Sequence, residues 1–187
     1  MGREKGNIFV ISAPSGAGKT TIIKNILQEI PDLSFSVSAT TRKKRDNEID
    51  GVDYFFLSEE EFKRKIDENA FLEWEKFYDY YYGTPKDFID EKIKNGKSVL
   101  LEVDVKGALR IKSIYPEAIL VYIYPPSFEV LVERLKKRKT EDETELKKRV
   151  ERAKMELSHK DKFDYLVVNE DLNTAVLEVK SLIKKIL

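Results

Sequence analysis

The sequence predicts an α/β fold built around a parallel β-sheet. Short apolar runs that are typical of strands buried on both faces of such a sheet occur at 7–12, 98–103, 118–124 and 165–168. A segment with helical character follows each of them, and this alternation is typical of parallel strands joined by helices. At 187 residues the chain suits one compact domain with one or two small insertions.

The first strand is expected to lead into a turn and then a helix. Residues 7–12 form an apolar run that is too short for a helix, and a glycine-bearing segment follows it directly. From Ile22 to Ile30 the apolar residues recur at helical spacing, and Pro31 ends the pattern. Strand, loop and helix thus occur in the order that a phosphate-binding loop requires.

The turn itself, residues 13–20, matches the phosphate-loop pattern GxxxxGK[ST], except that Ala13 replaces the first glycine. Gly16 and Gly18 allow the backbone to turn N–H groups toward a phosphate. Lys19 is expected to bridge the β- and γ-phosphates, and the Thr20 hydroxyl to bind Mg²⁺ together with the triphosphate oxygens. The loop therefore predicts a nucleoside triphosphate site with Mg²⁺ as cofactor. The predicted triphosphate-binding residues are Ala13, Pro14, Ser15, Gly16, Ala17, Gly18, Lys19, Thr20 and Thr21.

Residues 34–83 interrupt the alternation of strands and helices. Short alternating strands are expected at 35–39 and 53–57. A helix then opens at Ser58, whose side chain and that of Glu61 form the pattern of a capping box. This segment is expected to be an inserted subdomain.

A second departure is the stretch 136–149, which is almost entirely charged and lacks apolar periodicity. It predicts an exposed, mobile flap between two helices. The last helix is expected over 172–186, with Asp171 as its N-cap. The predicted division is a core of 1–33, 85–135 and 150–187, a subdomain of 34–84, and a lid of 136–149.

Composition excludes several classes of partner and site. Lys plus Arg and Asp plus Glu number 34 each, so the net charge is zero and no global field attracts nucleic acid or an anionic membrane. The absence of Cys and the single His exclude disulfides, thiolate metal sites and a His cluster for zinc. The longest apolar run, 118–124, is far shorter than the roughly 20 residues of a membrane span. We expect a cytoplasmic protein without nucleic-acid or membrane partners, and the sequence specifies no oligomeric state.

Further motifs occur in the order and spacing of one known family. They cover almost the entire chain: 36–45, Glu48, 51–56, 71–74, 81–84, 101–107, 125–127, 134–138, 140–141, Arg149 and 168–169. Together they strongly resemble the guanylate kinases. The resemblance implies a P-loop nucleoside monophosphate kinase fold, with a parallel core sheet flanked by helices, a GMP-binding insert and a short lid. It also implies transfer of the γ-phosphoryl group of ATP to GMP, and to dGMP, with Mg²⁺.

The chemistry of guanine agrees with two residues of these motifs. Guanine presents O6 as an acceptor beside the N1–H and N2–H₂ donors, so one carboxylate and one hydroxyl can read this edge. Glu73 and Ser38 have the side chains for these roles. Adenine would place its N1 acceptor against Glu73 and leave buried polar groups unpaired, which disfavours AMP.

The resemblance implies that Arg42, Arg45, Tyr54 and Tyr82 hold the phosphate of GMP. Two guanidinium groups and two phenol hydroxyls suit a dianion that must be held in line with the donor phosphate. Taken alone, the segment from Arg42 to Arg45 is more typical of a solvated basic turn, and only its place among the ordered family motifs favours a role in binding. Of the tyrosines 80–82, only Tyr82 is expected to contact phosphate.

Three further residues complete the predicted GMP site. Asp104 is similar to the family's second acidic residue, near guanine and the metal-bound waters, and Glu102 stands where many members carry Asp. Thr84 precedes Pro85, so it is expected either to cap the following helix or to contact GMP.

On the donor side, the resemblance implies that Arg138 and Arg149 reach the triphosphate and, with Lys19 and Arg42, form the catalytic set. Cations there stabilise the charge that spreads over the transferring phosphoryl group. Arg134 is expected to be either functional or paired with acidic residues in solvent. Asn169 is expected either to contact adenine or to shape the turn before the last helix.

Two other functions compete with this prediction. A related P-loop kinase could act on another monophosphate or a phosphorylated sugar, but Glu73 with Ser38 argues against this. Guanylate-kinase-like domains of scaffold proteins bind peptides and have lost ATP binding, which the intact loop at Gly16, Gly18 and Lys19 argues against.

Overall fold

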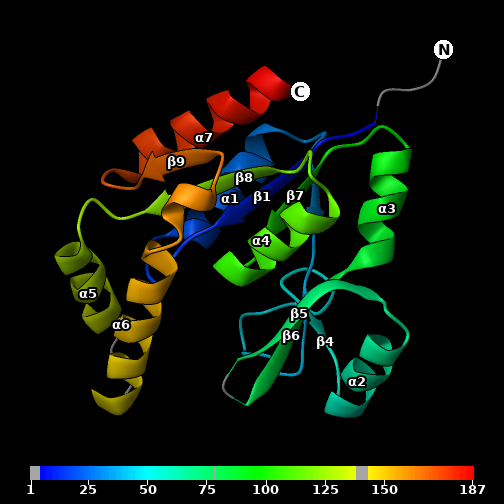
Figure 1. Ribbon diagram of the computed structural model, residues 1–187, viewed down its shortest axis with the longest axis horizontal. Helices are drawn as coiled ribbons and strands as arrows, with labels where there is room; N and C mark the ends of the chain where they lie inside the picture. The colour runs from blue at the N-terminus through cyan, green and yellow to red at the C-terminus, as the bar shows by residue number, and fades with distance from the viewer. Residues whose placement is uncertain (1–4, 78, 138–142) are drawn as a thin grey trace.

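The core of the protein is a parallel β-sheet, as predicted. The computed structural model describes residues 5–77, 79–137 and 143–187. Within this part of the chain a five-stranded sheet has the order β2-β7-β1-β8-β9, and each neighbouring pair is parallel (Figure 1). Its strands are β1 (Ile8–Ser12), β2 (Ser34–Ser36), β7 (Val99–Glu102), β8 (Ile119–Tyr124) and β9 (Tyr165–Val168). The four strands predicted from apolar runs are confirmed.

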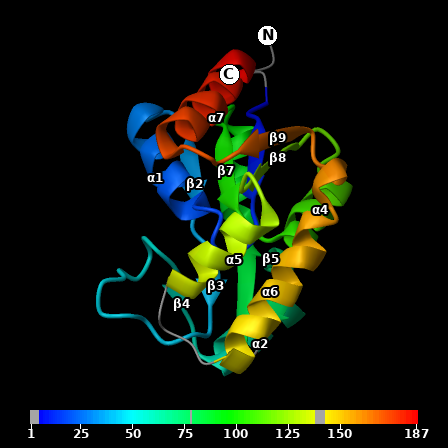
Figure 2. The same cartoon turned by 90° about the vertical axis from the view of Figure 1, so that its left-hand side faces the viewer.

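Helices cover both faces of this sheet, as Figure 2 shows from its edge, with α1 and α7 on one side and α4 on the other. Phe9 and Ile11 of β1 pack into the core on one face, while Ile8 and Val10 pack into the core on the opposite face. All four side chains are buried, which explains the uninterrupted apolar run. The covering helices are α1 (Lys19–Glu29) and α7 (Leu172–Ile186) on the first face, and α3 (Lys86–Lys94) and α4 (Val105–Ile114) on the second.

The prediction of one strand over 35–39 is wrong. The segment instead contributes to two sheets, because β2 (Ser34–Ser36) pairs with β7 in the core sheet and β3 (Ala39–Thr40) pairs with β6 in a second sheet. Alternating side chains predict extended backbone but do not specify the partner strand. Residues 34–36 therefore belong to the core sheet, although the sequence placed them in the insert.

A second, four-stranded sheet forms the inserted segment, in the order β4-β3-β6-β5. Its further elements are β4 (Phe55–Phe56), β5 (Phe71–Phe77), β6 (Tyr80–Pro85) and α2 (Glu59–Asp67). The predicted capping box at Ser58 and Glu61 is confirmed by hydrogen bonds in both directions. Phe62 of α2 is buried and stacks on Phe71, with ring centres 4.5 Å apart, so this helix is packed onto the sheet.

Two helices follow β8, α5 (Phe128–Lys137) and α6 (Glu143–Leu157), and a 3₁₀ turn (Lys160–Lys162) comes next. The flap prediction is therefore wrong for residues 136–137 and 143–149, which are helical. Val150 and Ala153 of α6 pack with Leu131 and Leu135 of α5, so a few apolar contacts stabilise a mainly charged helix. The predicted lid residues 138–142 lie outside the described residues.

Candidate active site

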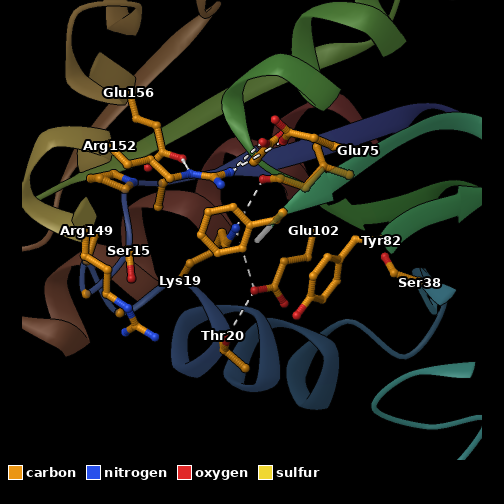
Figure 3. Close-up of a pocket in the computed structure, with 18 of the residues that line it drawn as sticks. Ser15, Lys19, Thr20, Ser38, Glu75, Tyr82, Glu102, Arg149, Arg152 and Glu156 are labelled. Atoms are coloured by element: carbon orange, nitrogen blue, oxygen red, sulfur yellow. Dashed lines mark hydrogen bonds and ion pairs between the residues drawn. The ribbon is translucent and has the colours of Figure 1, made fainter. Parts of the chain in front are cut away.

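A cavity of about 400 Å³ opens where β1 and β7 end, between the turn at 13–18, the second sheet and α6 (Figure 3). Ligands of open α/β sheets bind at this carboxyl edge of the strands. Most of the predicted site residues line this cavity: residues 13–21, Ser38, Tyr54, Glu73, Tyr82, Glu102, Asp104 and Arg149. Residues far apart in sequence thus face one space, which has a phosphate loop on one side and an acidic and aromatic wall on the other.

The phosphate loop has the backbone that its glycines predict. Gly16 and Gly18 both adopt left-handed backbone, with φ of 89° and 87°, and Gly18 is the N-cap of α1. The loop therefore ends at a helix N-terminus whose partial positive charge favours a phosphate. A Cβ atom at Gly18 would lie 2.6 Å from the Asn169 amide nitrogen, so any larger residue there would also displace this neighbour.

Lys19 and Thr20 meet the end of β7 at the floor of the cavity. Lys19 Nζ donates to the Val103 carbonyl at 3.1 Å and lies 3.8 Å from Glu102 Oε1. Thr20 Oγ1 donates to the same carboxylate oxygen at 2.9 Å. Glu102, which the sequence assigned to GMP, thus makes its polar contacts with the donor side of the cavity. A hydroxyl and a carboxylate are hard oxygen ligands, and this pair suits Mg²⁺.

Asn169 supports the phosphate loop from behind. Its side chain is buried and donates to the Ala17 carbonyl at 2.6 Å. Arg134 Nη2 in turn donates to the Asn169 carbonyl at 3.0 Å. The structure therefore gives Asn169 a contact with the loop that neither sequence-based alternative included. It also directs Arg134 toward β9 rather than toward acidic residues in solvent.

Glu73, the predicted guanine reader, lies on β5 opposite Thr84 of β6. The Thr84 hydroxyl donates to its carboxylate. Burial raises the pKa of Glu73 to about 7, an effect that the negative charges of Asp104 and Glu75 reinforce and the Thr84 hydrogen bond opposes. The prediction of Thr84 as a helix cap is wrong, because Pro85 is the N-cap of α3 and no side-chain bond caps that helix.

Arg42 is held in a fixed orientation by Glu48. Its two terminal nitrogens donate to the two oxygens of this carboxylate, at 3.0 and 2.7 Å. The guanidinium lies 5.5 Å from the centre of the Tyr54 ring, and the Tyr54 and Tyr82 rings are 6.2 Å apart. The hydrogen bonds from Arg42 lower the pKa of Glu48, so the pair stays charged. Three of the four predicted phosphate ligands are thus clustered, whereas Arg45 is exposed and donates only its backbone N–H to Glu48 among the contacts described.

Comparison with known proteins identifies the family. Residues 5–186 match the family model described as guanylate kinase. The chain belongs to the guanylate kinase family. It is 50% identical over 181 residues to the guanylate kinase of Caldanaerobacter subterraneus subsp. tengcongensis, covering 97% of this chain and 88% of that protein. It is 48% identical over 180 residues to the guanylate kinase of Thermotoga maritima, covering 96% and 87%.

The fold agrees with this assignment. The crystal structure of guanylate kinase from Anaplasma phagocytophilum matches with a TM-score of 0.82 and 28% identity, covering 99% of this chain and 88% of that one. Membership of the guanylate kinase family confirms the predicted α/β P-loop kinase fold and the enzyme class, a phosphotransferase that uses ATP and GMP.

Several residues that line the cavity were not predicted from the sequence. They are Glu75, Phe77 and Gly83 on the second sheet, Val103 after β7, and Arg152 and Glu156 on α6. The sequence contained a signal for two of them, because side chains alternate between the two faces of a strand and residues 75 and 77 therefore share a face with Glu73. The α6 residues were missed because the charged segment before them was interpreted as a flap. Arg149, which is predicted to reach the triphosphate, lines the cavity, whereas the predicted Arg138 lies outside the described residues.

Gly107 determines how closely α4 approaches the Glu73 carboxylate. A Cβ atom there would lie 2.9 Å from Glu73 Oε2 and 3.1 Å from Asp104 Oδ1. Gly107→Ala is therefore expected to displace the Glu73 carboxylate and raise KM for GMP by about tenfold, since small misplacements at reacting groups have large effects. The melting temperature should change little, because the greater helix preference of Ala opposes the cost of displacing Glu73 and crowding Asp104.

Steady-state kinetics and thermal melting of the Gly107→Ala variant check this expectation. KM for ATP is the internal control, because the phosphate loop is untouched. An unchanged KM for GMP would show that Glu73 does not depend on this close approach.

Proposed function

We propose that the 400 Å³ cavity holds GMP against the second sheet and the phosphates of ATP in the loop at 13–20, with the two substrates in line. The γ-phosphoryl group of ATP passes directly to the phosphate of GMP and yields ADP and GDP, without a covalent enzyme intermediate. The observation that carries this proposal is that one cavity has Lys19 at one wall and Glu73 at the other. Catalysis then rests on positioning and electrostatics.

In the proposed acceptor site the Glu73 carboxylate accepts hydrogen bonds from guanine N1–H and N2–H₂, and the Ser38 hydroxyl donates to O6. Thr84 holds Glu73 in place by its hydrogen bond. Asp104 lines the same wall, and its carboxylate also caps α4 by accepting from the Gly107 N–H at 2.8 Å. AMP is disfavoured because its N1 acceptor would face the Glu73 carboxylate.

The phosphate of GMP is proposed to bind at the cluster of Arg42, Tyr54 and Tyr82, with Arg45 approaching from the exposed side. Glu48 orients the Arg42 guanidinium through its paired hydrogen bonds. A guanidinium that is already fixed loses less conformational freedom when it binds a phosphate.

The donor phosphates are proposed to bind Lys19 and the N–H groups of the loop, with Thr20 and Glu102 as the residues that would hold Mg²⁺. The metal compensates the charge of the triphosphate. Arg149 faces the same cavity, and it stabilises the charge of the transferring group together with Arg138. Asn169 contributes by supporting the loop.

The proposed organisation has three parts. The acceptor part comprises residues 37–84 rather than 34–84, because β2 pairs with the core sheet. The proposed lid is still the segment 136–149, although residues 136–137 end α5 and residues 143–149 begin α6, so it is not the irregular flap that the sequence predicted. The rest of the chain forms the core. In the described ranges, no helix is both long and apolar enough to cross a membrane. We also propose that the protein is located in the cytoplasm, and that its partners are its small-molecule substrates rather than nucleic acid or a membrane.

A coupled ADP-release assay with GMP, dGMP, AMP, CMP, UMP and dTMP tests the acceptor. GMP should be preferred, dGMP should be accepted, and kcat/KM for AMP should be lower by about 10²-fold or more, because unpaired buried polar groups are costly. EDTA should stop turnover, and Mg²⁺ should restore it. Preference for AMP would assign another monophosphate kinase, and peptide binding without turnover would assign a scaffold domain.

A further inference from the structure

Arg152 joins three elements around the active-site cavity. From α6 its Nη2 atom donates to Asp104 Oδ2 at 2.8 Å and lies 3.5 Å from Glu75 Oε2. Its Nε atom donates to Glu156 Oε1 at 2.8 Å. The guanidinium carbon stands 3.8 Å from the centre of the Phe77 ring, which places a cation over an aromatic face. One partly buried side chain therefore links α6, β5 and the start of α4.

The partners of Arg152 on β5 are next to the guanine reader. Glu73, Glu75 and Phe77 alternate along the strand, so they share one face, and all three line the cavity. Arg152 contacts the second and third of them. Any shift of α6 that moves Arg152 therefore acts on the strand two residues away from Glu73.

The same face of α6 carries the arginine of the donor side. Arg149 precedes Arg152 by three residues and Glu156 follows it by four, which places the three on one side of a helix. In Figure 3 the Arg152 side chain points toward Glu75, whereas Arg149 points in another direction, on the side of Ser15. The helix thus presents one arginine to the donor loop and another to the acceptor sheet.

The charges around Arg152 explain its orientation. Glu75 and Asp104 approach each other, and hydrogen bonding with Asp104 together with burial raises the pKa of Glu75. Burial alone would raise the pKa of Asp104, but hydrogen bonds from Glu75 and the Gly107 N–H, with the charges of Arg152 and Lys19, lower it. Lys106 of α4 adds a further cation, with Nζ 3.1 Å from Glu75 Oε1. Arg152 is thus the cation that α6 contributes beside the carboxyl groups of Glu75 and Asp104.

We propose that Arg152 is a positioning residue that fixes the guanine-reading strand β5 against α6, and so couples the placement of Glu73 to that of Arg149. It acts through Glu75, Phe77 and Asp104 and does not contact the reacting phosphate. The proposal rests on the proposed arrangement of GMP along β5. Two observations separate it from a merely stabilising ion pair: the contacts cross from α6 to the acceptor sheet, and all the residues involved face the cavity.

The test compares Arg152→Met with Arg152→Lys by steady-state kinetics on GMP and ATP. For Arg152→Met, KM for GMP should rise about tenfold while KM for ATP changes less than about twofold, in the range typical of coupling through a contact network. Arg152→Lys keeps the charge but cannot bridge all three carboxylates, so KM for GMP should rise about threefold. Lys154→Ala is the matched control, because Lys154 is an exposed cation on the same helix.

A double variant distinguishes the proposed role from a simple loss of folding. Glu156 is buried and would lose its partner, so Arg152→Met is also made together with Glu156→Gln, and both proteins are compared by thermal melting. Wild-type turnover of GMP is measured first, since its absence would refute the proposed function itself. With wild-type turnover present, an unchanged KM for GMP in the double variant would refute only the role of Arg152.

A double-mutant cycle with Glu75→Gln tests the route of the coupling. If Arg152 acts through Glu75, the combined effect on kcat/KM for GMP should be smaller than the product of the two single effects. A combined effect on kcat/KM for GMP that equals the product of the two single effects would contradict the proposal. A large loss of kcat with both KM values unchanged would assign Arg152 to the transferring phosphate instead, and would also overturn it.

Discussion

Lys19→Ala should lower kcat by roughly 10³-fold or more with every acceptor, the scale on which single charge-stabilising groups act in phosphoryl transfer. Lys19 is the first residue of α1, and its ammonium lies in the cavity beside Val103 and Glu102. Alanine removes the charge that would bridge the β- and γ-phosphates. GMP binding should persist, because the acceptor wall belongs to another sheet.

Turnover is measured by ADP release and GMP binding by calorimetry, with circular dichroism to verify the fold. Lys24→Ala is a suitable control, because Lys24 is a largely exposed lysine of the same helix that pairs with Asp53 outside the cavity lining. A kcat within about tenfold of the wild-type value would contradict the assignment of Lys19 to the transferring phosphate.

Glu73→Gln should reduce kcat/KM for GMP by about 10²-fold and raise the relative activity on AMP, since an amide donor can face adenine N1. The carboxylate is deeply placed between β5, β6 and α4, where Thr84 donates to it. Guanine offers two donors to this position, and the amide can accept only with its oxygen.

The pH dependence gives the same variant a second measurement. Burial raises the pKa of Glu73 to about 7, so the carboxyl group is protonated below that pH and ionised above it. Only the ionised form accepts from guanine with both oxygens, so wild-type kcat/KM for GMP should rise as pH increases through about 7 and then level off. Glu73→Gln should lack this step.

Glu60→Gln, at an exposed position of α2, serves as the control for both measurements. A Glu73→Gln enzyme with the wild-type acceptor profile would show that another group reads guanine. A retained step near pH 7 in that variant would assign the titration to another group, such as the phosphate of GMP.

Local sequence was sufficient for the elements whose conformation depends on nearby residues. The glycines at 16 and 18 specify the left-handed turns of the phosphate loop, and Asp171 caps α7 through the Thr174 N–H. The capping box of α2 was predicted for the same reason, because its two partners are three residues apart. The resemblance to a known family supplied the acceptor residues, which no periodic pattern specifies.

The tertiary structure decided which residues meet across long stretches of chain. The segment 35–39 divides between two sheets, and Thr84 donates to Glu73 rather than capping a helix. Arg152 meets Asp104 over a separation of 48 residues. Such contacts depend on how packed helices and sheets orient whole faces toward one another, and the pattern within one segment does not contain that information.

The sequence by itself therefore determined the parallel core, the phosphate loop and, through family motifs, the kind of acceptor. Only the tertiary structure decided that α6 begins at Glu143, that Glu102 contacts Thr20 of the phosphate loop, and that Arg152 of α6 contacts Glu75 of β5. The physical reason is that backbone conformation follows from neighbours along the chain, whereas the partner of a charged side chain is fixed by the packing of distant elements.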